Sequence, residues 1–161
     1  MKGLRILEFG VVVVLLAMLS TPALAETRKA ELDGFQEVPA ISSTGSGEFR
    51  ARISQDDSTI EFELSYSGLE GTALFAHIHL GQPGVAGGVS VFLCGGGGKP
   101  ACPASGTVTG TVIAADVIGP TGQGIAPGEL GELLRAIRER VTYANVHTTK
   151  HPGGEIRGQI R

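Results

Sequence analysis

The stretch Ile60-Glu61-Phe62-Glu63-Leu64-Ser65-Tyr66 decides the fold class, because apolar and polar side chains alternate along it without a break. A period of two is typical of a β-strand that turns one face to a hydrophobic core and the other to solvent. Residues 49–53, Phe-Arg-Ala-Arg-Ile, alternate in the same way. Between the two runs lies Asp56-Asp57-Ser58, whose residue types favour a tight turn. The two runs therefore predict an antiparallel hairpin.

Further strands are predicted on both sides of this hairpin from the same alternation. The first of them ends at Pro39, which has no N–H to donate to a strand ladder. The predicted ranges are 30–38, 74–80, 88–93, 106–114, 141–148 and 155–160.

One segment has a helical period instead. Leucine and isoleucine recur at i, i+3, i+4 and i+7 from Leu130 to Ile137, which predicts a short amphipathic helix over Glu129–Arg140. The chain has 25 glycines, 5% aromatic residues and no tryptophan, which fits many turns around a core of small aliphatic side chains. We therefore expect one all-β domain, an antiparallel two-sheet sandwich with Greek-key links and one helix.

The N-terminus has the pattern of an export signal. Lys2 and Arg5 precede an unbroken apolar run at 11–18, and Ala23-Leu24-Ala25 offers the small-x-small pattern of a cleavage site. We expect residues 1–25 to be removed as a signal peptide and residues 26–161 to form a secreted or periplasmic domain. No later run approaches the roughly 20 apolar residues of a membrane-spanning helix, so we expect no membrane span after cleavage. A retained N-terminal anchor helix is the alternative.

Charge and cysteine content limit the partners further. The formal net charge is −3, and it becomes −4 once Lys2, Arg5 and Glu8 are removed, which gives no basic footprint for nucleic acid. Cys94 and Cys102 are the only cysteines. In an oxidising compartment such a pair favours a disulfide. A metal-binding pair is the weaker alternative, because no second Cys-x-x-Cys and no adjacent histidine supports it.

The histidines are the one set of side chains in the sequence that clearly suits metal binding. His77 and His79 are two residues apart in a predicted strand, so they project from the same face, and His147 shares a face with Tyr143 and Asn145 in a later strand. If the two strands are neighbours, three imidazoles converge, and neutral imidazole is a ligand for copper and zinc. Copper is the preferred ion and zinc fits almost as well.

Other polar residues are candidates around these three. His151, in a turn before Pro152, is the weakest candidate for a fourth metal ligand. Glu37 is a candidate partner of an imidazole N–H. Asn145 and Thr148 suit a hydrogen-bonded network in which the histidines pin strands together and bind nothing. Glu155 and Arg157 share a strand face, either as an ion pair near the histidines or as a solvated pair of little energetic value.

Catalytic patterns are absent from the sequence. The serines do not lie in a G-x-S-x-G elbow, and no acidic pair is typical of a glycosidase. We therefore expect catalysis only if a metal supplies it, as in a metal-dependent redox enzyme. A different alternative is an extracellular protein-interaction module with structural histidines and no metal. It predicts an apolar surface patch, with Phe35, Phe75 and Phe92 as the side chains to test.

Four segments together resemble the CHRD (chordin) domain found in chordin and in short secreted bacterial proteins. They are LDGFQEVPAISSTGSG (32–47), AHIHLGQPGVAGGV (76–89), YANVHT (143–148) and PGGEIRGQI (152–160). The resemblance implies an extracellular β-rich domain, and the family carries no firm common activity. The H-x-H strand is also similar to the strand that begins the copper site of Cu,Zn superoxide dismutase, itself a β-sandwich, which implies a dismutase-like or immunoglobulin-like sandwich. That enzyme's zinc loop has no counterpart in residues 81–88.

Overall fold

A computed structural model describes residues 25–161 and confirms the predicted hairpin. Strands β2 (Ser46–Ile53) and β3 (Ile60–Ser67) pair antiparallel, with Phe49 opposite Leu64. The apolar members of the two alternating runs are buried in the core, and most of the polar members between them are exposed. The alternation of apolar and polar residues therefore arises, as expected, from a sheet with one buried face.

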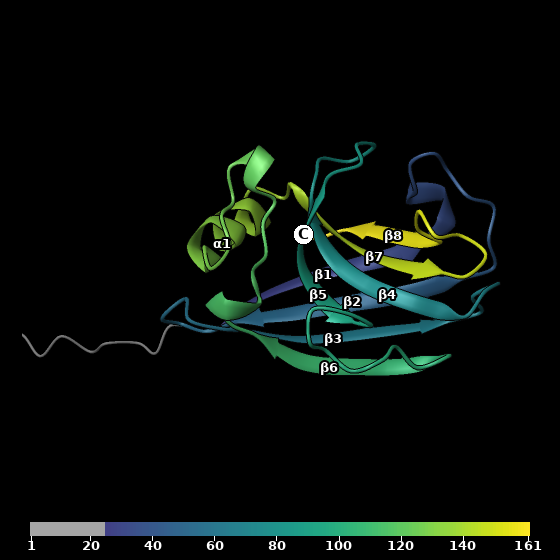
Figure 1. Cartoon of the computed structure of the whole chain (residues 1–161), viewed down its shortest axis with the longest axis horizontal. Coiled ribbons are helices and arrows are strands. Elements are labelled where there is room, and N and C mark those ends of the chain that lie inside the picture. Colours follow the sequence, from purple (N-terminus) through teal and green to yellow (C-terminus); the bar gives the residue numbers. More distant parts are fainter. Residues whose placement is uncertain (1–24) are drawn as a thin grey trace, which may run out of the picture.

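The remaining predicted strands and the helix are also present (Figure 1). Three short 3-10 turns were not predicted. The first of them ends strand β1 at Asp33, earlier than expected, because the Asp33 carboxylate accepts hydrogen bonds from the backbone N–H groups of Phe35 and Gln36. The elements are β1 (Glu26–Asp33), η1 (Gly34–Gln36), β4 (Ala73–Leu80), β5 (Gly88–Cys94), β6 (Gly106–Val112), η2 (Ala114–Asp116), η3 (Thr121–Gln123), α1 (Leu130–Arg138), β7 (Thr142–Thr148) and β8 (Ile156–Gln159).

All eight strands belong to one antiparallel sheet, in the order β5-β4-β7-β8-β1-β2-β3-β6. The expected division into two sheets is not seen, because β1 pairs with β2 on one side and with β8 on the other. Close approach at this junction requires a glycine: a Cβ on Gly158 would lie 2.2 Å from the carbonyl oxygen of Glu31. Beyond β8, Lys29 and Arg161 exchange backbone hydrogen bonds of 2.9 and 2.8 Å. The two halves therefore form one continuous sheet.

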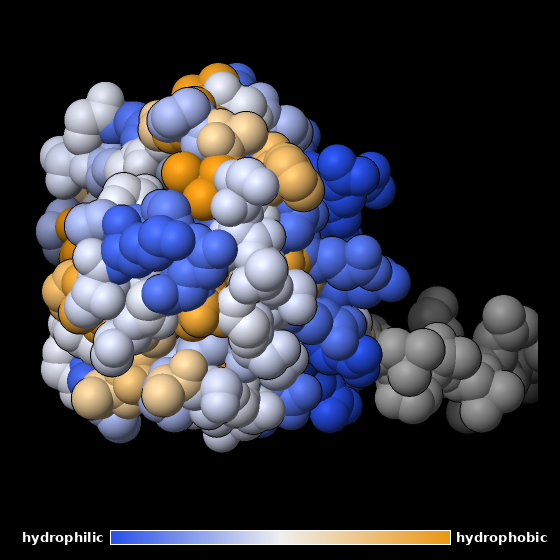
Figure 2. Space-filling model, turned by 90° about the vertical axis from the view of Figure 1, so that its right-hand side faces the viewer, coloured by the Kyte–Doolittle hydropathy of each residue, from blue (hydrophilic) through white to orange (hydrophobic). Residues whose placement is uncertain are grey.

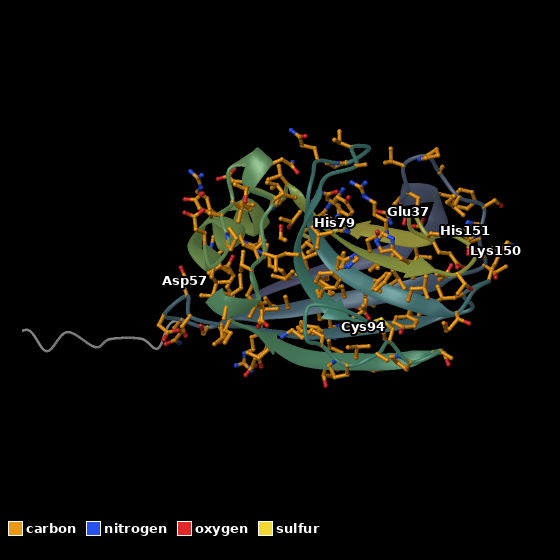
Figure 3. All side chains as sticks on the ribbon, viewed as in Figure 1. Glu37, Asp57, His79, Cys94, Lys150 and His151 are labelled. Carbon is orange, nitrogen blue, oxygen red and sulfur yellow. A yellow bond between two sulfur atoms is a disulfide. The ribbon has the colours of Figure 1, made fainter. Side chains whose placement is uncertain are left out.

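The sheet curls until its edge strands β5 and β6 come near each other, which gives a nearly closed barrel. The predicted disulfide between Cys94 and Cys102 is present and joins the end of β5 to the segment before β6. Cys94 lies at this edge in Figure 3. Within the connecting segment, Lys99 Nζ pairs with Asp116 at 2.8 Å and donates to the carbonyl of Thr111 in β6. The connection thus holds the two edges together.

Helix α1 lies at one end of the curled sheet (Figure 1). Its three leucines and its isoleucine, spaced as the sequence analysis found, are buried in the common core. Arg138 in its last turn reaches the carboxylates of Glu26 and Asp57, at 2.9 and 2.6 Å. Within residues 25–161, none of the helices has the length and apolar character needed to cross a bilayer. The predicted export signal lies outside the described residues, apart from Ala25.

Candidate metal centre

Strands β4 and β7 are neighbours in the sheet, as the convergence of the histidines requires. In their register Phe75 lies opposite His147, His77 opposite Asn145, and His79 opposite Tyr143. The residues that alternate with these, such as Ile78 and Val146, are fully buried in the hydrophobic core. The three imidazoles therefore project together from the face of the sheet that is turned away from that core.

The three imidazole rings form one compact cluster. The ring centroids of His77 and His147 are 4.9 Å apart, those of His77 and His79 are 5.2 Å apart, and those of His79 and His147 are 5.9 Å apart. One nitrogen from each ring can be chosen so that all three lie within 4.8 Å of one another. The predicted convergence is confirmed, and we refer to these three residues as the histidine cluster.

Backbone carbonyl groups hold two of the rings in a defined orientation. Nδ1 of His79 lies 3.0 Å from the carbonyl oxygen of Gly87, and Nδ1 of His147 lies 2.9 Å from that of Pro152. A carbonyl oxygen only accepts, so each Nδ1 must carry the proton. In the neutral ring the lone pair then belongs to Nε2, which is the form in which histidine binds a metal.

The loop between β4 and β5 supplies one of these carbonyls because its glycines permit a tight return. A Cβ on Gly87 would lie 1.6 Å from the carbonyl oxygen of Leu80, so no other residue fits there without movement of the backbone. The hydroxyl of Tyr143 also contacts this turn and accepts a hydrogen bond of 3.1 Å from the Gly87 N–H. Gly87 thus allows the loop between β4 and β5 to contact the histidine cluster.

Nitrogen atoms of the cluster are buried and left without partners. His77 and His79 are each only 6% exposed. Nε2 of all three histidines and Nδ1 of His77 have no hydrogen-bond partner among residues 25–161, and they are four of the seven such buried side-chain atoms in that range. A buried polar atom without a hydrogen-bond partner lowers stability, so four such atoms in one cluster require an explanation.

Burial keeps the cluster uncharged at neutral pH. Burial, together with the neighbouring imidazoles of His147 and His79, lowers the pKa of His77 to about 3. The pKa of His79 falls to about 4, again mainly through burial, although the hydrogen bond to Gly87 opposes the fall. Burial also lowers the pKa of His147. All three rings therefore offer lone pairs rather than positive charges.

Aromatic side chains surround the cluster. The ring of Tyr143 is parallel to that of His79, with centroids 4.7 Å apart, and the guanidinium carbon of Arg157 lies 3.4 Å from the Tyr143 centroid. On the other side, Phe92 meets His77 edge-on at 4.4 Å, and Phe75 stacks on His77 at 5.9 Å. The sequence placed Tyr143 on the correct face but did not reveal these stacks.

Glu37 and His151, which are labelled in Figure 3, are engaged with other side chains. Nε2 of His151 is 3.3 Å from the Glu70 carboxylate, and His151 is not among the three converging ligands. The Glu37 carboxylate accepts a hydrogen bond from the Asn145 amide, which also donates to the carbonyl of Ile156. Burial raises the pKa of Glu37 to about 7, against the opposing effects of Asn145 and Arg157.

Thr148, Glu155 and Arg157 take part in two separate sets of contacts. The fully buried Glu155 carboxylate accepts hydrogen bonds from the hydroxyls of Thr148 and Ser43, each at 2.7 Å, and from the Glu70 N–H. Arg157 donates to the carbonyl of Gln82. No ion pair joins Glu155 and Arg157 in the described part of the chain. Of these three residues, only Arg157 contacts an aromatic ring of the cluster's surroundings, that of Tyr143.

Exposed aromatic side chains are few. Phe35 is 73% exposed and Phe75 is 39% exposed, whereas Phe92 is half-buried against His77. Figure 2 shows small hydrophobic patches interrupted by strongly hydrophilic ones on the face of the molecule that it presents. On that face there is no continuous apolar surface of the kind that a protein-interaction module predicts.

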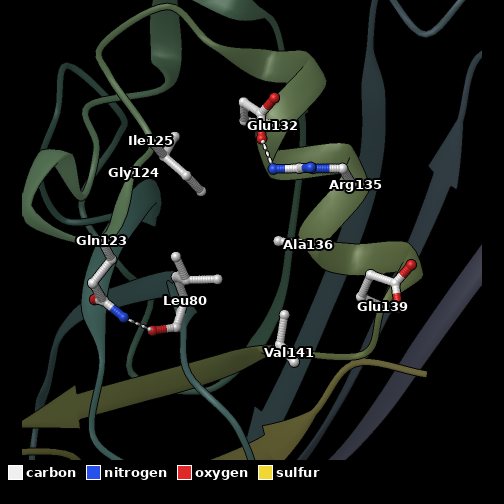
Figure 4. Close-up of a pocket in the computed structure, with 9 residues that line it drawn as sticks. All are labelled: Leu80, Gln123, Gly124, Ile125, Glu132, Arg135, Ala136, Glu139 and Val141. Carbon is white, nitrogen blue, oxygen red and sulfur yellow. Dashed lines mark hydrogen bonds and ion pairs between the residues drawn. The ribbon is translucent and has the colours of Figure 1, made fainter.

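A cleft of about 430 Å³ lies between α1 and residues 123–125 (Figure 4). Leu80 and Val141 lie on one side of it, and the Glu132–Arg135 ion pair lies on the helix side. None of the residues that the sequence analysis singled out as metal ligands lines this cleft.

Comparison with known proteins gives one match. A family model described as the CHRD domain matches residues 28–160, which is nearly all of the described chain. None of the curated proteins and none of the solved structures matches.

Proposed function

Because the chain belongs to the CHRD family, we propose that it is an exported extracellular or periplasmic module that binds one copper or zinc ion through His77, His79 and His147. One observation carries this proposal. Three neutral imidazoles, two of them buried and that of His147 partly buried, each offer a ring nitrogen to a common space, and their Nε2 atoms have no partner within residues 25–161. A metal ion would satisfy all three at once.

The dimensions of the cluster support the proposal. Zinc and copper bind imidazole nitrogen at about 2.0–2.1 Å, so two nitrogens on one ion lie at most about 4.2 Å apart. The three nitrogens, all within 4.8 Å of one another, need only small changes of side-chain torsion to reach this range. The carbonyls of Gly87 and Pro152 supply the outer hydrogen bonds that orient metal-binding histidines.

Export is supported by two independent features. The first is the sequence pattern of residues 1–25. The second is the disulfide between the only two cysteines, which is typical of an oxidising compartment.

The test is elemental analysis of protein produced from the full-length sequence, after loading with copper or zinc and exhaustive dialysis. We expect about one equivalent of metal in the wild type and almost none in a His77→Gln/His147→Gln variant, because two of the three ligands are gone. His151→Gln is the matched control: it removes the one histidine outside the cluster and should retain the metal. Circular dichroism confirms that each variant folds.

Two results would contradict the proposal: no retained metal in the wild type, or equal retention in the folded double variant. The histidines would then be a structural network, and the search would turn to an extracellular protein partner. Exposed Phe35 would be the first side chain to replace in that search.

A further inference from the structure

The histidine cluster contains no group that could neutralise a bound cation. Within residues 25–161, the potential ligands that converge there are three imidazoles, with no aspartate, glutamate or cysteine among them. Nδ1 of His79 and of His147 donates to a carbonyl oxygen, so these rings would bind an ion through the Nε2 lone pair and would bring no negative charge. A bound ion would therefore keep its full charge.

The groups around the cluster do not lower the cost of that charge. Arg157 is a cation one aromatic ring away from His79, since its guanidinium stacks on Tyr143 and Tyr143 stacks on His79. Phe75 and Phe92 form an apolar wall against His77. The Glu37 carboxylate, which could oppose the charge, has its pKa raised to about 7 by burial and is therefore only partly ionised at neutral pH.

Glu155 is the other buried carboxylate near β7, and it is occupied by its own donors. It accepts hydrogen bonds from Ser43, Thr148 and the Glu70 N–H, and none of these atoms belongs to the cluster. The cost of burying an ion rises with the square of its charge, so a buried divalent ion beside Arg157 is much more costly than a monovalent one.

The number of available ligands also favours a monovalent ion. Zinc held by three histidines needs a water as its fourth ligand, and Cu(II) prefers a square-planar or tetragonal set of four or more ligands. Cu(I) is satisfied by three ligands in a plane. The fourth histidine of the chain, His151, is directed to Glu70 and is not among the converging ligands.

We propose that the histidine cluster is selective for monovalent copper, binding Cu(I) in preference to Cu(II) and Zn(II). The inference rests on the metal site proposed above and adds the oxidation state that the site accepts. Its physical basis is the juxtaposition of three neutral nitrogen ligands, an apolar aromatic wall and the Arg157 cation.

The test compares the three ions on the same protein. Cu(I) is titrated without oxygen against bicinchoninate, and Cu(II) and Zn(II) are titrated against chelators of known affinity. We expect one Cu(I) per chain, bound at least about 100-fold more tightly than either divalent ion. For a one-electron couple this ratio places the reduction potential of the bound copper at least about 120 mV above that of aqueous copper, at 59 mV per tenfold.

A second variant isolates the role of charge. Arg157→Gln removes the cation but keeps a donor for the Gln82 carbonyl. It should lower the reduction potential, because Cu(II) gains more than Cu(I) from the loss of a neighbouring positive charge. Arg138→Gln, which removes a cation bound to Glu26 and Asp57 next to α1, is the control and should leave the potential unchanged.

The outcomes separate the two proposals. If Zn(II) or Cu(II) binds as tightly as Cu(I), the selectivity is wrong and the metal site itself stands. If none of the three ions binds, both proposals are wrong. An unchanged potential in a folded Arg157→Gln protein would overturn the electrostatic basis. If that variant does not fold, the potential of the wild type decides alone.

Discussion

His77 illustrates how a single buried residue links the stability of the domain to pH. Its pKa is about 3 in the folded protein, mainly because of burial, against about 6.5 for an exposed imidazole. Between these values the unfolded chain binds a proton that the folded chain does not. The contribution of His77 is therefore complete above about pH 6.5 and is lost progressively as the pH falls.

We predict that the metal-free protein loses about 2 kcal/mol of unfolding free energy on account of His77 between pH 7.5 and pH 5. Urea unfolding at both pH values, with a chelator present, measures the loss in the wild type and in His77→Gln. The difference between the two losses isolates His77. This subtraction is needed because the raised pKa of Glu37 acts in the opposite direction, favouring the folded state at low pH. Equal losses in the two proteins would contradict the prediction.

At the scale of residues, the sequence predicted which side chains share a face, because alternation along a strand is a local property. It therefore placed His77, His79 and His147 together once β4 and β7 proved to be neighbours. It could not predict the partners of their Nδ1 atoms, which are the backbone carbonyls of Gly87 and Pro152. Every residue carries a carbonyl group, so no residue type signals which one will meet an imidazole.

At the scale of elements, helix α1 shows the strength of a regular period. The spacing of its leucines predicted a helix whose ends differ from the observed ones by one or two residues, and its apolar stripe is buried as expected. The 3-10 turn after β1 was not predicted. It forms because the Asp33 carboxylate accepts hydrogen bonds from the backbone N–H groups of Phe35 and Gln36 and so ends the strand. Such local capping competes with strand pairing and leaves only a weak signal in the alternation.

The buried stripe of α1 makes a testable contribution to stability. Leu134 is fully buried in the core, whereas the side chain of its neighbour Arg135 is 74% exposed. We predict that Leu134→Ala lowers the unfolding free energy by about 2–5 kcal/mol, through lost burial and a residual cavity. Arg135→Ala is the matched control. It removes only a surface ion pair with Glu132 and should change the value by less than about 0.5 kcal/mol. Chemical denaturation measures both, and similar values for the two would contradict the assignment of faces.

At the scale of the whole molecule, the strands were predictable but their assembly into one sheet was not. Pairing of β1 with β8 joins residues more than 100 positions apart, and alternation within a strand carries no information about which strand lies beside it. The predicted fold class, all-β with one helix, is therefore confirmed. The predicted division of the strands into two sheets is not, because the strands form one continuous sheet. Gly158 permits the close approach to Glu31, but in the sequence it stands out only as part of the motif at 152–160.

The position of strand β1 supports a prediction on processing. Strand β1 begins at Glu26, which lies opposite Ile53 and pairs with Arg138 of α1. Cleavage after Ala25 would leave this strand whole, whereas cleavage further along would remove a residue that ties the sheet to the helix. We therefore predict that protein recovered from outside the cytoplasm begins at Glu26, as N-terminal sequencing and intact mass would show. Ala23→Leu/Ala25→Leu should block cleavage by removing both small residues of the site. Recovery of the uncleaved chain from the wild type would instead support a retained anchor, and a start inside β1 would contradict the role given to Glu26.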